Sequence, residues 1–117
     1  MPAIGQNFTM VSGDTAEIDF TIFDHAGVPL DLTGAKIEWQ MAWTASTPAL
    51  VSKSTANGGV NVTNPQAGQL KVLLAHADTS GLFAGAYYHE TKVLDSQGDV
   101  ATAATGTVTL LPALIKS

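Results

Sequence analysis

The chain has 117 residues, of which 45% are hydrophobic and 13% charged, and this length fits one domain with one core. Five lysines against ten acidic residues give a net charge of −5, and arginine is absent, which argues against nucleic acids and anionic membrane surfaces as partners. The absence of cysteine excludes disulfides, thiolate metal sites and thiol catalysis.

Targeting and membrane signals are missing from the sequence. The first twelve residues contain no lysine or arginine and are interrupted by Pro2 and Gly5, so they do not fit a secretory signal. No apolar run approaches the roughly 20 residues that a membrane-spanning helix needs. We therefore expect synthesis in the cytoplasm without a signal peptide, and no membrane insertion.

The first half of the chain alternates between apolar and polar residues, which is the pattern of strands with one buried face. From residue 16 to 23, Ile18, Phe20 and Ile22 share one face, and Phe20 is predicted to lie in the core. After turns at residues 24–27 and 31–34, the segment 36–43 alternates most clearly. It places Trp39 and Trp43 on the same face.

The second half predicts further short strands at 50–51, 60–62 and 68–74, a single helical turn within 76–82, and long strands at 85–94 and 100–111. A hairpin turn at residues 95–99 separates the last two strands. Seven or eight short strands with almost no helix predict an all-β fold, an antiparallel β-sandwich. One domain is expected over residues 1–117, with its core at about 13–111 and short extensions at both ends.

Candidate catalytic and metal-binding residues do not form recognisable motifs. His25, His76 and His89 lack the spacing of metal ligands on a helix or strand. The segment 95–99 is explained better by a hairpin turn than by a calcium loop. No serine stands between a strand and a long helix, as the nucleophile of a hydrolase does. The sequence therefore predicts a protein that is not an enzyme and has no metal or cofactor.

The aromatic residues are expected to serve mainly the core. Trp39 on the central strand fits a core position, and Tyr87 after Gly85 fits a tyrosine corner, in which the phenol bonds back to the preceding turn. Phe83 is expected to plug the bottom of the sandwich. For Trp43, at the end of its strand, two interpretations remain: packing in the core, or presentation of its ring to a partner.

Both ends of the chain carry apolar residues in excess of what the rim of one sandwich needs. Met1 to Met10 and Leu110 to Ile115 are these segments. They pack either on their own sheet or on a neighbouring subunit, and the sequence does not decide between the two. Leu114 and Ile115, together with Trp43, are therefore the candidate interface residues.

Several turn and strand phrases occur in an order that resembles the immunoglobulin-like β-sandwich domains of tailed-phage and prophage virion proteins. The amino-terminal domain of baseplate upper proteins is one example. The similar phrases span about residues 13 to 111 and are Gly13-Asp14-Thr15, Asp24-His25-Ala26-Gly27-Val28-Pro29, Asp31-Leu32-Thr33-Gly34-Ala35, Gly59-Val60-Asn61-Val62, Ala67-Gly68-Gln69-Leu70, Leu82-Phe83-Ala84-Gly85-Ala86-Tyr87, Asp95-Ser96-Gln97-Gly98 and Gly106-Thr107-Val108-Thr109.

The chain departs from this pattern after Tyr87. His89 and Thr91 occupy inward positions that are usually aromatic or aliphatic in the family, which predicts a locally polar interior with His89 partly buried. Baseplate upper proteins are also much longer, and their later domains are missing from this sequence.

The resemblance implies a structural or connecting role in a virion, in the tail, baseplate or head–tail region, and no catalytic residue. The implied partners are other virion proteins and further copies of the chain, and the implied location is the virion. The alternative is a carbohydrate- or surface-binding module in which Trp43 stacks on a sugar beside the loop Thr44 to Thr47.

Overall fold

The fold is seen in a computed structural model, which describes residues 7–23, 26–95 and 97–114. The elements follow one another as β1 (Phe8–Val11), β2 (Ala16–Thr21), β3 (Lys36–Ala42), β4 (Val51–Ser54), β5 (Val60–Asn64), a 3-10 turn at Pro65–Ala67, β6 (Gln69–Leu74), α1 (His76–Thr79), β7 (Gly85–Leu94) and β8 (Val100–Leu111). Among the described residues, no helix has the length and apolar character that a membrane crossing requires.

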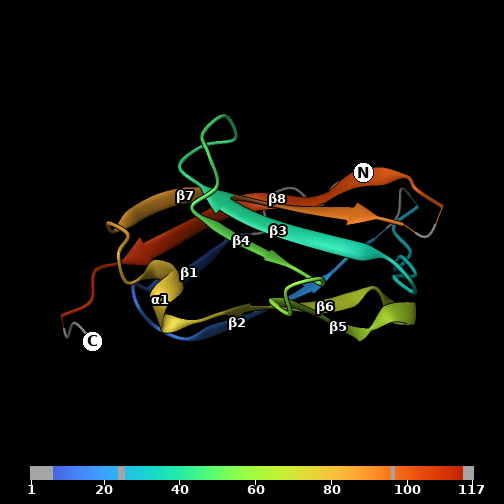
Figure 1. The fold of residues 1–117 in the computed structure, drawn as a ribbon, viewed down its shortest axis with the longest axis horizontal. Coiled ribbons are helices and arrows are strands. Elements are labelled where there is room, and N and C mark those ends of the chain that lie inside the picture. The colour runs from blue at the N-terminus through green and yellow to red at the C-terminus, as the bar shows by residue number, and fades with distance from the viewer. Residues whose placement is uncertain (1–6, 24–25, 96, 115–117) are drawn as a thin grey trace.

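The eight strands form two facing sheets, which Figure 1 shows as two layers. One sheet has five strands in the order β1-β8-β7-β3-β4, and the other has three in the order β2-β6-β5. This arrangement confirms the predicted all-β, immunoglobulin-like sandwich. One pairing between the named strands is parallel, that of β1 with β8. These two strands are far apart in the sequence, so no hairpin connection fixes their relative direction.

The core forms where the inward faces of the two sheets meet. On β3, Ile37, Trp39 and Met41 alternate inward and are buried, as the sequence pattern predicts. Phe20 on β2 faces them from the opposite sheet and is also buried. A period of two residues is therefore sufficient to orient these strands, since each strand has only one buried face.

The two apolar ends of the chain behave differently. Residues of the amino-terminal segment pack within the sandwich: Met10 is buried, and Phe8 lies against the ring of His89 with centroids 5.3 Å apart. Leu114 at the other end is 96% exposed. The sandwich thus begins at β1, before the predicted core boundary, and Ile115 lies outside the described residues.

A polar cluster occupies the centre of the core. The indole Nε1 of Trp39 donates a hydrogen bond of 3.2 Å to Nδ1 of His89, and the rings of Phe8 and Phe20 lie 5.3 and 5.9 Å from the imidazole. His89 is fully buried, where the sequence predicted only partial burial. Thr91 is also fully buried, and its Oγ1 has no hydrogen-bond partner among the described atoms. The predicted polar interior is therefore present.

The free edge of β4 is covered by a side chain. The backbone N–H of Thr55 donates to the carbonyl of Ile37 on β3. Because alternate residues of an edge strand direct their backbone groups to the neighbouring strand, those of Ser52 and Ser54 point away from the sheet. Asn57 reaches both: its Oδ1 accepts the N–H of Ser54 at 3.0 Å, and its Nδ2 donates to the carbonyl of Ser52 at 3.5 Å. A side-chain amide thus takes the place of a neighbouring strand.

Tyr87 forms the predicted tyrosine corner. Its phenol donates a hydrogen bond of 2.5 Å to the backbone carbonyl of Phe83, four residues earlier, and the residue is 1% exposed. Burial raises the pKa of the Tyr87 phenol above its usual value of 10.0. This bond joins the start of β7 to the loop that precedes it.

We expect Tyr87→Phe to lower the free energy of unfolding by about 1 kcal/mol at neutral pH, because one buried hydrogen bond is lost. The folded state holds the phenol proton more tightly than the unfolded state, so stability is intact below about pH 10 and falls as the pH rises above it. The variant should therefore lose less stability than the parent between about pH 8 and about pH 11. Urea unfolding across this range measures both effects. Equal alkaline losses in the two proteins would contradict the assignment.

Candidate functional site

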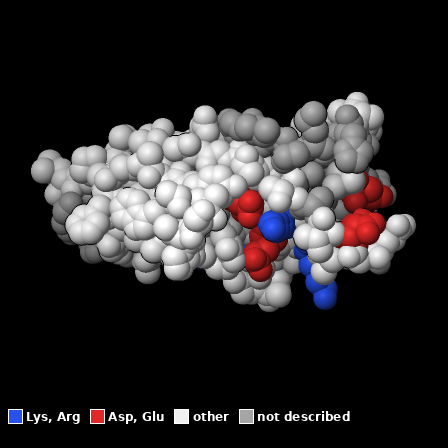
Figure 2. Space-filling view, turned by 90° about the horizontal axis from the view of Figure 1, so that it is seen from above, with Lys and Arg blue, Asp and Glu red and all other residues white. Residues whose placement is uncertain are grey.

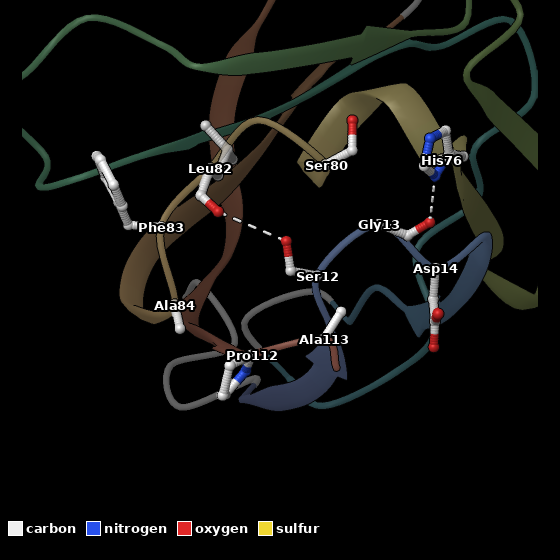
Figure 3. A pocket seen from close by; sticks show the side chains of 10 residues that line it. All are labelled: Ser12, Gly13, Asp14, His76, Ser80, Leu82, Phe83, Ala84, Pro112 and Ala113. Atoms are coloured by element: carbon white, nitrogen blue, oxygen red, sulfur yellow. Dashed lines mark hydrogen bonds between the residues drawn. The ribbon is translucent and has the colours of Figure 1, made fainter. Parts of the chain in front are cut away.

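A pocket of about 240 Å³ opens at the end of the sandwich where α1 lies. It is enclosed by the turn between β1 and β2, by α1 with the loop that follows it, and by the residues after β8 (Figure 3). Ser12, Asp14, His76 and Ser80 supply its polar atoms, and Phe83 and Pro112 belong to its apolar wall. No local sequence pattern indicates this pocket, because its polar residues come from segments more than sixty positions apart.

The side chains of Ser12 and His76 in the pocket are bonded to the backbone. Because a carbonyl only accepts, His76 Nδ1 carries the proton in its 2.7 Å contact with the carbonyl of Gly13. The Ser12 hydroxyl lies 2.9 Å from the carbonyl of Thr79, and the Gly13 N–H donates to Thr79 Oγ1 at 2.8 Å. These bonds fasten the β1–β2 turn to α1. They do not align Ser12 with His76 as nucleophile and base.

The other residues considered for chemistry lie apart from this pocket. His89 is in the core and His25 lies outside the described residues. Asp95 Oδ1 accepts the backbone N–H groups of Gln97 and Asp99 at 2.9 and 3.0 Å, which is how a turn former acts. Within the described ranges, no three histidine or acidic side chains are grouped as a metal site requires.

Trp43 stands at the same end of the sandwich, directly after β3. Its ring stacks on that of Tyr87, with centroids 4.5 Å apart and planes at 23°, and the residue remains 46% exposed. Trp43 therefore combines the two interpretations of its sequence position: one part of the indole covers a core tyrosine, and the rest faces solvent.

Further large apolar side chains are exposed around Trp43. Phe83 is 79% exposed, so the prediction that it plugs the sandwich is wrong. Its carbonyl is held by Tyr87, which fills the interior at this level, and the Phe83 ring is left outside. Leu111 and Leu114 follow at the end of β8, exposed by 44% and 96%. We call these four residues, Trp43, Phe83, Leu111 and Leu114, the apolar end.

Comparisons with known proteins agree with the fold. No protein-family model matches the sequence, and no curated protein matches it. Among solved structures, CopC from Methylosinus trichosporium OB3b is similar with a TM-score of 0.50 and 14% identity, over 92% of this chain and 85% of that chain. This likeness concerns the β-sandwich alone.

Two immunoglobulin-type structures are also similar at lower scores. Murine CRIg has a TM-score of 0.39 at 12% identity, and the Ig1 domain of mouse SynCAM 2 has 0.37 at 16%, each over 92% of both chains. The arrangement of its own strands in two facing sheets makes the chain an immunoglobulin-like β-sandwich. Its function has to be inferred from its own surface.

Proposed function

We propose that this chain is a non-enzymatic structural or connecting subunit of a tailed-phage or prophage particle, acting by protein–protein assembly. The apolar end carries this proposal. Trp43, Phe83, Leu111 and Leu114 are all at least 44% exposed, and they belong to the end of the sandwich where β3 and β8 end and β7 begins. Trp43 lies on the inner side of the sheet against Tyr87, and Leu111 alternates with the buried Leu110. Large exposed apolar side chains of this kind are the anchors that interfaces use.

The charge distribution supports an interface at this end. Seen from the side of the five-stranded sheet, the lysine and acidic side chains lie over the half remote from the apolar end (Figure 2). A chain of net charge −5 repels its own copies, so on this face the part with few charges is the favourable place for them to meet. The assignment to a phage particle follows from the sequence resemblance, and the expected partners are further copies and other virion proteins.

The assembly proposal predicts a concentration-dependent mass larger than the 12.1 kDa of one chain, measured by size-exclusion chromatography with light scattering. Leu114→Asp should shift the protein toward the monomer, because a charge in an apolar interface loses its hydration. Val100→Asp is the matched control, since Val100 is 63% exposed at the far end of the five-stranded sheet and the charge change is the same. A monomer at every concentration, or equal effects of both variants, would contradict self-assembly through the apolar end.

The exposed part of the Trp43 ring favours one second candidate, a carbohydrate-binding module. Its neighbours Thr44 and Thr47 are bonded to each other, with the Thr44 N–H donating to Thr47 Oγ1 at 2.9 Å. A glycan screen monitored by tryptophan fluorescence separates the two functions. A glycan-induced change that disappears in Trp43→Ala would favour this second function over assembly.

A further inference from the structure

A small groove lies on the outer face of the five-stranded sheet, beneath the loop between β3 and β4. This loop rises from the outer side of the sheet (Figure 1). Below it, Gln40 and Ala42 of β3 pair in register with Glu90 and Tyr88 of β7. The groove between loop and sheet has a volume of about 50 Å³. It is separate from the pocket beside α1 and from the apolar end.

The groove presents hydrogen-bond acceptors. The Tyr88 hydroxyl donates to Glu90 Oε1 at 3.0 Å, and Gln40 Nε2 donates to Glu38 Oε1 at 3.0 Å. Burial, and then the bond and charge of Glu90, raise the pKa of Tyr88, so this donor stays protonated at neutral pH. These bonds occupy donors, while each carboxylate still has lone pairs to offer. Such a surface suits a ligand that brings donors.

No lysine of the described chain is ion-paired with Glu90. The two ion pairs within the described residues join Lys53 to Asp78 and Lys71 to Glu17. The carboxylate of Glu90 is half-buried beside the ring of Tyr88, and Lys92, two residues further along the same face of β7, lies opposite Glu38 and forms no ion pair with Glu90. A cation placed beside a carboxylate and an aromatic ring is attracted by both groups, by the charge of the carboxylate and by the quadrupole of the ring.

The loop above the groove is held in one shape by its own bonds. The N–H of Thr44 donates to Thr47 Oγ1 at 2.9 Å, and the N–H of Ser46 donates to Thr44 Oγ1 at 3.2 Å. At the base of the loop, Trp43 is stacked on Tyr87. Because the β3–β4 loop is already ordered, it loses little conformational entropy when a ligand binds beneath it.

We infer that this groove receives the guanidinium group of an arginine from a partner protein, with the Tyr88 ring against its plane and Glu90 as its counter-ion. The groove, at about 50 Å³, is much smaller than the pocket of about 240 Å³ beside α1, which suits the flat end group of one side chain. A guanidinium is planar, stacks on aromatic rings and binds carboxylates through a fork of donors.

These 117 residues contain no arginine, and the arginine that we infer belongs to a different protein. The inference rests on the proposed assembly function, because the protein that supplies the arginine is expected to be another subunit. It adds the chemistry by which the two proteins contact each other.

The test uses the whole isolated chain, labelled with ¹⁵N, and the peptide acetyl-Gly-Arg-Gly-amide as the probe. We expect backbone amide shifts at Gln40, Tyr88 and Glu90, weakened by added salt because the contact is charged. The same peptide with citrulline in place of arginine is nearly isosteric but neutral. Its binding should be at least about tenfold weaker, since charge-assisted hydrogen bonds are lost.

Variants assign the binding to named groups. Glu90→Gln should weaken the arginine peptide about fivefold or more. Asp19→Asn, on an exposed position of the other sheet, changes the net charge by the same amount and should alter binding less than about twofold. Tyr88→Phe keeps the ring and should bind, whereas Tyr88→Ala should not. The amide spectrum of each variant shows whether it is folded.

Three results would overturn the inference: no shift with the arginine peptide, equal binding of the citrulline peptide, or equal losses in Glu90→Gln and Asp19→Asn. Shifts at the same amides with a neutral methyl glycoside alone would assign the groove to a sugar instead. The titration does not depend on oligomeric state. If the peptide binds and the mass stays monomeric, self-assembly fails and the arginine site stands. If the peptide does not bind and the mass rises with concentration, the arginine site fails and self-assembly stands.

Discussion

Replacing Trp39 by alanine should lower the free energy of unfolding by about 3–5 kcal/mol, because a fully buried indole leaves a cavity in the core. The substitution also removes the N–H that His89 Nδ1 accepts, and His89 is itself fully buried. Urea unfolding followed by far-ultraviolet circular dichroism measures the change.

A more conservative variant separates the cavity from the hydrogen bond. Trp39→Phe keeps much of the volume and removes the donor, so a loss of about 1–3 kcal/mol is expected from the unpaired imidazole nitrogen. A loss below about 1 kcal/mol in Trp39→Ala would mean that this side chain faces solvent, and the register of β3 would then be inverted.

Gly68→Ala is expected to be about as damaging. Gly68 has φ +68°, and a Cβ there would lie 2.5 Å from the carbonyl oxygen of Ile22 and 2.9 Å from that of Leu30. These are backbone atoms in a bonded arrangement, since Ile22 N–H donates to the Gly68 carbonyl and Leu30 N–H donates to the Ile22 carbonyl, each at 2.8 Å. The left-handed conformation costs about 1–2 kcal/mol, and displacing the backbone should bring the loss to about 3 kcal/mol or more.

Gly27→Ala provides the matched control for this position. Gly27 has a similar φ of +78°, and a Cβ there would meet nothing within 4 Å. Only the conformational strain remains, so a loss of about 1–2 kcal/mol is expected. Comparable thermal unfolding midpoints for the two variants would show that the close approach at Gly68 does not matter.

Hydropathy alternation was sufficient to predict the central strands and the class of fold, and it failed where contacts are distant in sequence. Trp39 and Phe20 follow from a period of two residues. β1 has only four residues and is stabilised by pairing with β8, about a hundred positions away, so no local pattern indicates it. Phe83 was misassigned because the spacing of a loop residue does not tell whether its side chain or its carbonyl faces inward.

The candidate sites were less accessible to sequence reasoning. Trp43, Leu114 and Ile115 could be named from their position at segment ends, but the exposure of Phe83 and Leu111 depends on how three elements terminate together. The groove beneath the β3–β4 loop requires the register that places Gln40 opposite Glu90, and register between distant strands is a tertiary property. The alternation did place Tyr88 and Glu90 on the outer face.

The hydrogen bonds of the Asn57 amide affect how copies of this chain meet at high concentration. In the particle that we propose, many copies of one chain would be packed at high local concentration, where an open strand edge recruits the edge of the next copy and grows into a fibre. Because Asn57 already bonds the Ser54 N–H and the Ser52 carbonyl, sheet growth at the edge of β4 is hindered. At this edge, contact between copies is therefore left to side chains, and side-chain contacts can close into a finite ring.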